Sequence, residues 1–102
     1  MSTAVRSELS LLESICGGWS KFEPLTQEDV EIFQFATRGL LGVHYEPSSV
    51  SRQVVAGVNY RFRCTVIPVV LNPEEYDAIV QIYKPLEGEG EPFITSIKPV
   101  LL

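Results

Sequence analysis

Cysteine and histidine are scarce in this chain, and their scarcity argues against several kinds of chemistry. The two cysteines, Cys16 and Cys64, are too few for the disulfide framework of a small secreted domain, so we interpret both as free thiols in a reducing compartment. His44 is the single histidine. A metal centre needs more His or Cys ligands, and Cys–His catalysis would need a thiol and an orienting third group beside His44. We therefore expect no metal, no cofactor and no enzymatic activity.

Positive charge and long apolar runs are also in short supply. Eight Lys and Arg residues stand against thirteen Asp and Glu, a formal net charge of -5. Such an acidic surface repels both phosphate backbones and anionic membranes. No segment approaches the run of about 20 apolar residues that a membrane span requires. Arg6, Glu8 and Glu13 interrupt the apolar centre that a signal peptide would need. These features predict a cytoplasmic protein that binds neither nucleic acid nor membranes.

The composition is that of one globular domain with a short extension. Hydrophobic residues make up 45% and charged residues 21% of the 102 positions, which is enough for a core without metal or disulfide support. We place the domain at residues 15–102 and treat residues 1–14 as an N-terminal extension. Apolar residues from Val5 to Cys16 recur at helical spacing, so this part is either a short amphipathic helix or a flexible arm.

The strongest helix pattern lies between residues 26 and 41. Thr26 is the expected N-cap, and Glu28 and Asp29 place negative charge in the first turn, where the helix dipole favours it. Gly42 is the expected C-terminal cap. The predicted apolar stripe of this helix consists of Val30, Phe33, Thr37, Leu40 and Leu41.

Beyond residue 42 the hydrophobic period changes from 3.6 to 2, the period of half-buried strands. Three segments alternate in this way: residues 60–68, 76–84 and 93–99. Arg61 and Arg63 give the first of them a basic outer face, and Phe93 and Ile97 share one face of the last. The polar stretch from Glu46 to Arg52 is only weakly patterned as a strand. One helix followed by consecutive strands predicts an α+β fold, with an antiparallel meander wrapped around the helix.

The turn before the first of these strands has an unusual composition. It reads Gln53-Val54-Val55-Ala56-Gly57, with three consecutive apolar side chains where Asn, Asp or Pro normally stand. An apolar hairpin tip lowers the solubility of the free protein. The pattern therefore favours a tip that is buried in the groove of a partner.

Taken together, these motifs closely resemble the cystatin superfamily, and within it the stefins, single-domain intracellular inhibitors of papain-like cysteine proteases. The tip fits the family's Gln-x-Val-x-Gly hairpin and continues into Asn59-Tyr60, as stefins commonly do. Ile15-Cys16-Gly17-Gly18-Trp19-Ser20 resembles the stefin amino-terminal segment with its essential glycine. Ile82-Tyr83-Lys84-Pro85-Leu86-Glu87-Gly88 falls where the family's second binding hairpin lies.

The resemblance implies a cystatin-like fold, one long helix wrapped by a four- to five-stranded antiparallel sheet. It also implies reversible, tight-binding inhibition of papain-family proteases of the cathepsin type, with three segments occluding the active-site cleft. The protease-binding residues would be Ile15, Cys16, Gly17 and Gly18 in the arm, Gln53, Val54, Val55, Ala56 and Gly57 in the first hairpin, and Leu86, Glu87 and Gly88 in the second. The protein would be a monomer, able to form a domain-swapped dimer if the first hairpin straightened.

Two features depart from the stefin pattern. Fourteen residues precede Ile15, whereas stefins usually begin only a few residues before the glycine. The second hairpin carries Glu87, Glu89 and Glu91 in place of the usual Leu-Pro pair. Both features favour an alternative, a cystatin-fold interaction module that binds another partner and does not inhibit proteases.

Overall fold

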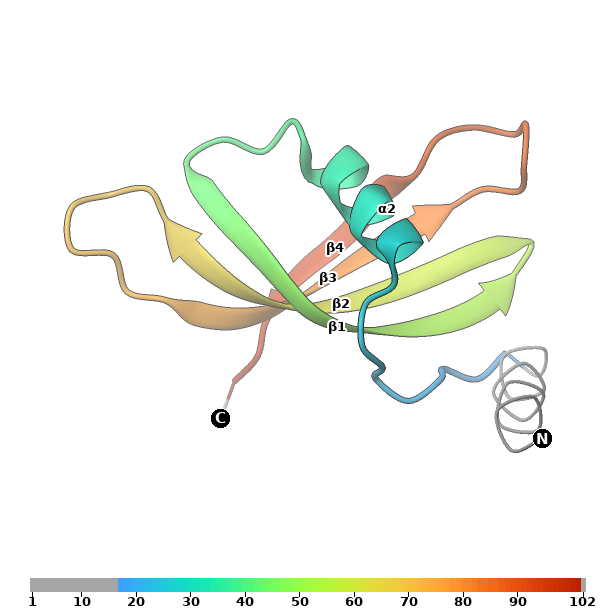
Figure 1. Cartoon of the computed structure of the whole chain (residues 1–102), viewed down its shortest axis with the longest axis horizontal. Coiled ribbons are helices and arrows are strands. Elements are labelled where there is room, and N and C mark those ends of the chain that lie inside the picture. Colours follow the sequence, from blue (N-terminus) through green and yellow to red (C-terminus); the bar gives the residue numbers. More distant parts are fainter. Residues whose placement is uncertain (1–16, 102) are drawn as a thin grey trace.

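The computed structural model describes residues 17–101, and its architecture is α+β, as the sequence predicts. One helix lies across one face of an open, four-stranded antiparallel sheet (Figure 1). The strands follow one another in the order β1-β2-β3-β4, so each pairs with its neighbour in the chain. The elements are α2 (Gln27–Thr37), β1 (Val43–Val55), β2 (Gly57–Pro68), β3 (Tyr76–Lys84) and β4 (Phe93–Pro99).

The helix begins where the sequence predicts. The Thr26 hydroxyl accepts a hydrogen bond from the backbone N–H of Asp29 (3.2 Å), and the Asp29 carboxylate accepts one from the backbone N–H of Thr26 (2.9 Å). This reciprocal capping box satisfies two backbone donors of the first turn and places a negative charge at the positive end of the helix dipole.

The helix ends at Thr37, four residues earlier than predicted, and Gly42 is not its cap. Side chains already bind the last carbonyls: the Thr37 hydroxyl donates to Phe33 O (2.7 Å), and the Arg38 guanidinium donates to Phe35 O (2.7 Å). Gly39, a poor helix former, follows directly. The predicted apolar stripe is correspondingly wrong at its far end, because Leu41 is 90% exposed.

The core lies between α2 and the sheet. From the helix come Ile32 and Phe33, of which the sequence predicted only Phe33. From β2 come Tyr60, Phe62 and Cys64, which share one face of the strand as the alternation predicts. The Phe33 and Phe62 rings meet at 5.0 Å between centroids. The strands add Val50, Val66, Ala78, Val80 and Ile82, all fully buried.

Two β-bulges break the strand alternation. In β1, Pro47 lies opposite Cys64 and Ser49 opposite Arg63, so one extra residue intervenes. The inward-facing positions therefore change from odd numbers (Tyr45) to even numbers (Val50), which explains the weak pattern of this strand.

In β4, the register shifts beside Gln81 and Ile82 of β3. Ile97 pairs with Val80, on the helix-covered face, whereas Phe93 pairs with Tyr83 on the other face. The shared face that the sequence predicts for Phe93 and Ile97 is therefore wrong.

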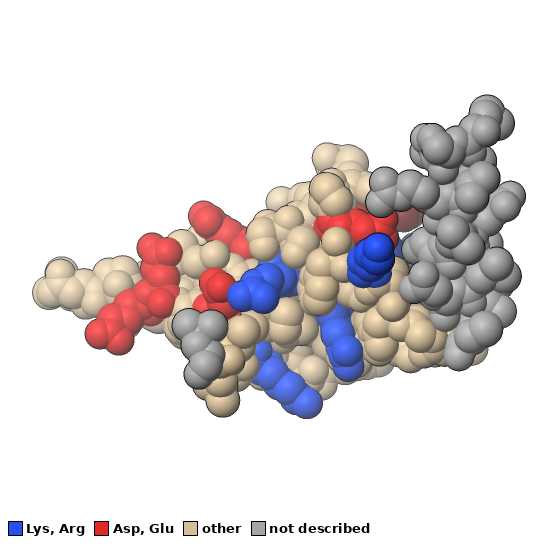
Figure 2. Space-filling model, turned by 90° about the horizontal axis from the view of Figure 1, so that it is seen from below, with Lys and Arg blue, Asp and Glu red and all other residues tan. Residues whose placement is uncertain are grey.

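Charged side chains are distributed unevenly over the surface. Seen from below, Lys and Arg gather over the middle of the molecule, and several carboxylates lie toward its left-hand end (Figure 2). On the outer face of the sheet, Arg61 Nε donates to Gln81 Oε1 (3.1 Å) and Arg63 pairs with Asp77 (3.1 Å). No helix within residues 17–101 is long and apolar enough to cross a membrane.

Candidate binding edge

The apolar hairpin tip joins β1 to β2 and is open to solvent. Val55 is 43% exposed, Ala56 is exposed and Val54 is half-buried. Val54 and Val58 pair across the two strands just below the turn. The tip therefore presents small apolar side chains on a backbone that the strand pairing already holds in place, so little conformational freedom is left to lose on binding.

Gly57 closes the tip against the end of β3. Its φ of +110° is a conformation that side-chain-bearing residues rarely adopt, and a Cβ atom there would lie 2.5 Å from Lys84 O and 2.9 Å from the Tyr83 hydroxyl. The Tyr83 hydroxyl donates a hydrogen bond to the carbonyl of Ala56. Because Lys84 ends β3, these contacts place the tip next to the start of the β3–β4 loop.

Gln53 connects the tip to the glycine arm. Its Oε1 accepts a hydrogen bond from Asn59 Nδ2 (3.0 Å), directly across the β1–β2 pair. Its Nε2 donates to the carbonyl of Gly17 (2.5 Å). One side chain of β1 thus bonds both to β2 and to the arm, and it fixes the distance between the hairpin and the arm.

The arm reaches this edge through two glycines. Gly17 is exposed and has a φ of +83°, with no atom within 4 Å of the place where a Cβ would stand. Its requirement for glycine therefore comes from backbone conformation and not from crowding. Gly18 is half-buried. The predicted protease-binding residues Ile15 and Cys16 lie outside the described residues.

The β3–β4 loop forms the third part of the edge. We name residues 85–92 the acidic loop, because Glu87, Glu89 and Glu91 are all exposed there. Leu86 is half exposed, and its carbonyl accepts a hydrogen bond from the backbone N–H of Glu89 (2.9 Å). Gly88 has a φ of +81°, which this turn requires.

These three segments lie at one end of the molecule. The hairpin tip and the acidic loop both project toward the right-hand end in Figure 1, and the described chain begins there. We name residues 17–18, 53–57 and 85–92 together the binding edge. The structure thus brings together every described residue that the sequence predicts for protease binding.

Several residues that build the edge were not singled out from the sequence. Asn59 and Tyr83 bind the tip through side-chain hydrogen bonds, and Ser20 bonds to β1. Trp19, which we interpret from sequence as a packing residue or as a platform beside the arm, lies under the Arg61 guanidinium at 3.9 Å from the ring centroid. The alternation of β2 predicts that Asn59 and Arg61 share the outer face, and the structure confirms this. No sequence pattern indicates that the Ser20 hydroxyl bonds to β1.

Of the cysteine and histidine side chains, Cys64 and His44 lie away from this edge, and Cys16 is outside the described residues. Cys64 is buried in the core, and burial raises the pKa of its thiol to about 12, so the thiol is protonated at neutral pH. His44 is exposed in β1, with Nε2 3.3 Å from Glu46 Oε1. In the described part of the chain, no group of three or more His, Cys, Asp or Glu side chains could hold a metal ion.

No protein-family model, curated protein sequence or solved structure matches this chain. The function must therefore be argued from the residues and from their geometry.

Proposed function

We propose that this chain is a stefin-like inhibitor that binds papain-family cysteine proteases of the cathepsin type reversibly and tightly. The observation that carries the proposal is the connection made by Gln53, which joins the glycine arm to an exposed apolar tip. An arm, a tip and a loop on one edge can enter a groove together. The tip would fill the groove beside the catalytic cysteine, and the arm and the acidic loop would lie on either side of it.

The fold is consistent with this proposal. A cystatin-like domain wraps an antiparallel sheet around one helix, and here α2 crosses a four-stranded sheet. In place of a fifth strand, the segment before the helix pairs with β1 at a single bridge, Glu23 with Val50.

The proposed mechanism needs no chemistry from the inhibitor. Val54, Val55 and Ala56 would exclude water from the cleft through apolar contact. Gly17 has a positive φ, which favours glycine. It would let the arm pass close to the enzyme and turn away, so that no peptide bond is presented for attack. In the same proposal the protein acts as a monomer in the cytoplasm, where Cys64 stays a free thiol.

Titration against papain and a lysosomal-type cathepsin tests the proposal. Val55→Asp should weaken inhibition more than tenfold, because it places a charge in the apolar contact. Val69→Asp is the matched control: Val69 is 70% exposed in the loop between β2 and β3, at the opposite end of β2 from the tip. No inhibition by the unsubstituted protein at micromolar concentration would refute the proposal, and equal inhibition by Val55→Asp would refute the role of the tip.

Truncation tests the arm separately. Deletion of residues 1–14 should leave inhibition intact, whereas deletion through Gly17 should weaken it about tenfold, the effect of losing an apolar anchor worth about 1.4 kcal/mol. Equal affinities of the two truncated forms would exclude a contribution from the arm.

A cystatin-fold interaction module without inhibitory activity is the second candidate. The acidic loop favours it, since none of its three exposed carboxylates has an ion-pair partner within residues 17–101. Tight inhibition of either protease would exclude this alternative.

A further inference from the structure

The segment that follows the glycine arm pairs with β1, and it has one more residue between its two points of attachment than β1 has. Glu23 and Val50 exchange two backbone hydrogen bonds, of 2.8 and 3.0 Å. The next backbone bond runs from Ser20 N to Arg52 O (2.8 Å). The segment that follows the arm advances by three residues between these two points, from Ser20 to Glu23, whereas β1 advances by two, from Val50 to Arg52, so this segment forms a bulge. Bulges change the direction of a strand, and this one directly follows the two glycines and Trp19 in the sequence.

Two serine hydroxyls complete the pairing at this bulge. Ser20 Oγ accepts a hydrogen bond from Arg52 N (2.9 Å), where a backbone carbonyl would serve in a regular ladder. Ser51 Oγ donates to Ser20 O (2.5 Å). Both serines are buried, at 8% and 2% exposure. With the bond from Ser20 N, three hydrogen bonds hold Ser20, two residues after the arm, against β1, and two of them need a hydroxyl.

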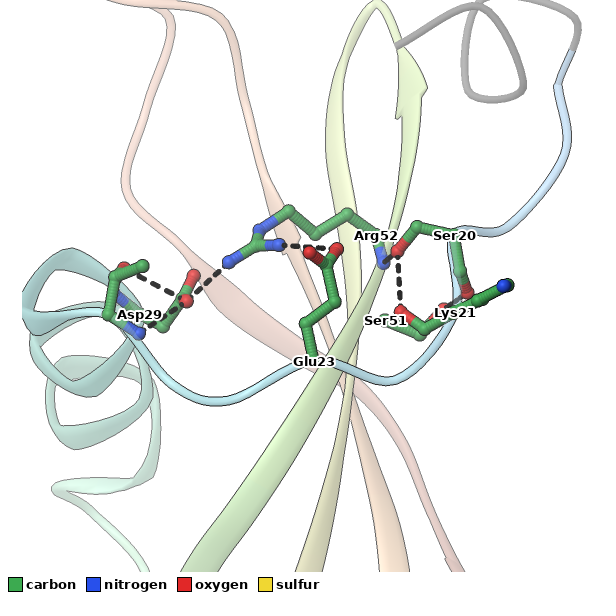
Figure 3. A network of polar contacts seen from close by, with 7 residues as sticks. Ser20, Lys21, Glu23, Asp29, Ser51 and Arg52 are labelled. Carbon is green, nitrogen blue, oxygen red and sulfur yellow. Dashed lines mark hydrogen bonds and ion pairs between the residues drawn. The ribbon is translucent and has the colours of Figure 1, made fainter. Parts of the chain in front are cut away.

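The Arg52 side chain ties this attachment to the helix. It leaves β1 on the helix-covered face, and Figure 3 shows it pointing toward Asp29. Its guanidinium binds the Asp29 carboxylate, which is nearly fully buried and also caps the helix, and it lies 3.5 Å from Glu23 Oε1. Arg52 therefore links the segment at Glu23, strand β1 and the first turn of α2, so that each restricts the movement of the others.

We infer that Ser20, Ser51 and Arg52 form a clasp that positions the glycine arm beside the hairpin tip. This inference rests on the proposed function, and it names the residues that hold the arm in position for binding. Beyond the clasp, two further side-chain contacts hold the described residues 17–19: Arg61 over Trp19, and Gln53 Nε2 on the Gly17 carbonyl. These are exposed or half-buried. The buried clasp fixes the arm before the protease is met, so less ordering remains to be done on binding.

Ser51→Ala is the most selective test of the clasp. It removes the hydroxyl that bonds Ser20 O and leaves the backbone pairing of β1 and β2 in place. Ser49→Ala is the matched control, since Ser49 lies on the same outer face of β1 and its hydroxyl bonds to no residue within 17–101. We expect Ser51→Ala to weaken protease inhibition about tenfold and Ser49→Ala to leave it unchanged.

A double-mutant cycle separates positioning from general destabilisation. In a form deleted through Gly17, the arm is gone, so Ser51→Ala should no longer change the inhibition constant. An equal loss in the full chain and in the deleted form would mean that the substitution acts through the tip, and it would overturn the inference. The inference would also be overturned if deletion through Gly17 weakens inhibition but Ser51→Ala in the full chain leaves inhibition unchanged.

A measurement without protease keeps the two proposals apart. In Ser20→Ala the Arg52 amide loses its acceptor, so its hydrogen exchange should accelerate at least tenfold, whereas Ser20→Thr keeps the hydroxyl and should restore slow exchange. If the unsubstituted chain inhibits no protease but this exchange pattern holds, the proposed function fails and the clasp stands as an attachment of the arm. Unchanged exchange in Ser20→Ala would overturn the clasp itself, whatever the protease assay gives.

Discussion

Replacement of Gly57 by alanine should destabilise this protein more than the same change at any other described glycine. Two separate costs combine at this position. The backbone has a φ of +110°, and the added Cβ would lie 2.5 Å from Lys84 O, 2.9 Å from the Tyr83 hydroxyl and 3.0 Å from Tyr83 Cε1. The nearest of these atoms belongs to the backbone of β3 and cannot rotate away, so β2 and β3 must separate at their ends.

Two other glycines isolate the two costs. Gly42 has a φ of +79° but open space around it, so Gly42→Ala carries only the conformational cost, about 1–2 kcal/mol. Gly39 has neither a positive φ nor a close neighbour, so Gly39→Ala should be neutral or stabilise by up to about 1 kcal/mol, because alanine restricts the unfolded chain. For Gly57→Ala, the forced contact adds about 1–3 kcal/mol, which gives a total of about 2–5 kcal/mol.

Equilibrium unfolding in urea measures all three variants on one scale. The expected order of the free energy of unfolding is Gly39→Ala highest, then Gly42→Ala, then Gly57→Ala. A loss of 2–5 kcal/mol is a large part of the roughly 5–15 kcal/mol of a typical domain, so the last variant should unfold at much lower urea. If Gly57→Ala and Gly42→Ala agree within about 0.5 kcal/mol, the contact with β3 is not what requires glycine at the tip.

Three further predictions concern pH, charge and assembly. Burial raises the pKa of Cys64 from 9.0 and of Tyr60 from 10.0, both to about 12. The unfolded chain therefore loses these protons first. The free energy of unfolding should fall by about 1.4 kcal/mol per pH unit for each group, from about pH 9 for Cys64 and from about pH 10 for Tyr60; a flat profile in urea titrations up to pH 12 would contradict this. Replacement of the three glutamates of the acidic loop by glutamine should speed association with proteases whose cleft rim is acidic and slow it where the rim is basic, and stopped-flow rates that do not change with salt would exclude this effect. Mild heating should produce a domain-swapped dimer by straightening the turn at residues 53–57, and gel filtration that detects monomer alone would count against it.

The sequence predicted those parts of the fold that depend on local chemistry or on an unbroken period. Thr26 and Asp29 specify the helix start through bonds to their own backbone neighbours, so no distant contact can change the outcome. The alternation in β2 survives because this central strand pairs on both sides, and Tyr60, Phe62 and Cys64 are buried as predicted. The exposed tip was likewise evident from three apolar residues in a turn.

The parts that were missed depend on side chains that reach across the fold. The helix ends early because the side chains of Thr37 and Arg38 bond its last carbonyls. Helical periodicity in the sequence does not predict such bonds. The acidic residue Asp29 is buried only because Arg52, 23 positions away, meets it in space. Likewise the bond of Gln53 to Asn59 is local to its own hairpin, but its bond to Gly17 requires the arm to lie beside β1.

A hydroxyl side chain accompanies each of the three bulges in the structure. Ser20 accepts from β1 at the bulge of the arm, Ser48 Oγ donates to Arg63 O (3.1 Å) in β1, and Thr95 Oγ1 donates to Gln81 O (3.3 Å) in β4. A bulge changes the face on which every following residue of the strand lies. By bonding at the bulges, these small side chains therefore influence which residues face the core. The bulge at Ser48 turns Ser51 and Gln53 to the outer face, where the arm runs, and turns Arg52 toward the helix. The five-residue tip motif lies beside the arm because the bulge before it sets the faces of the residues that hold the arm.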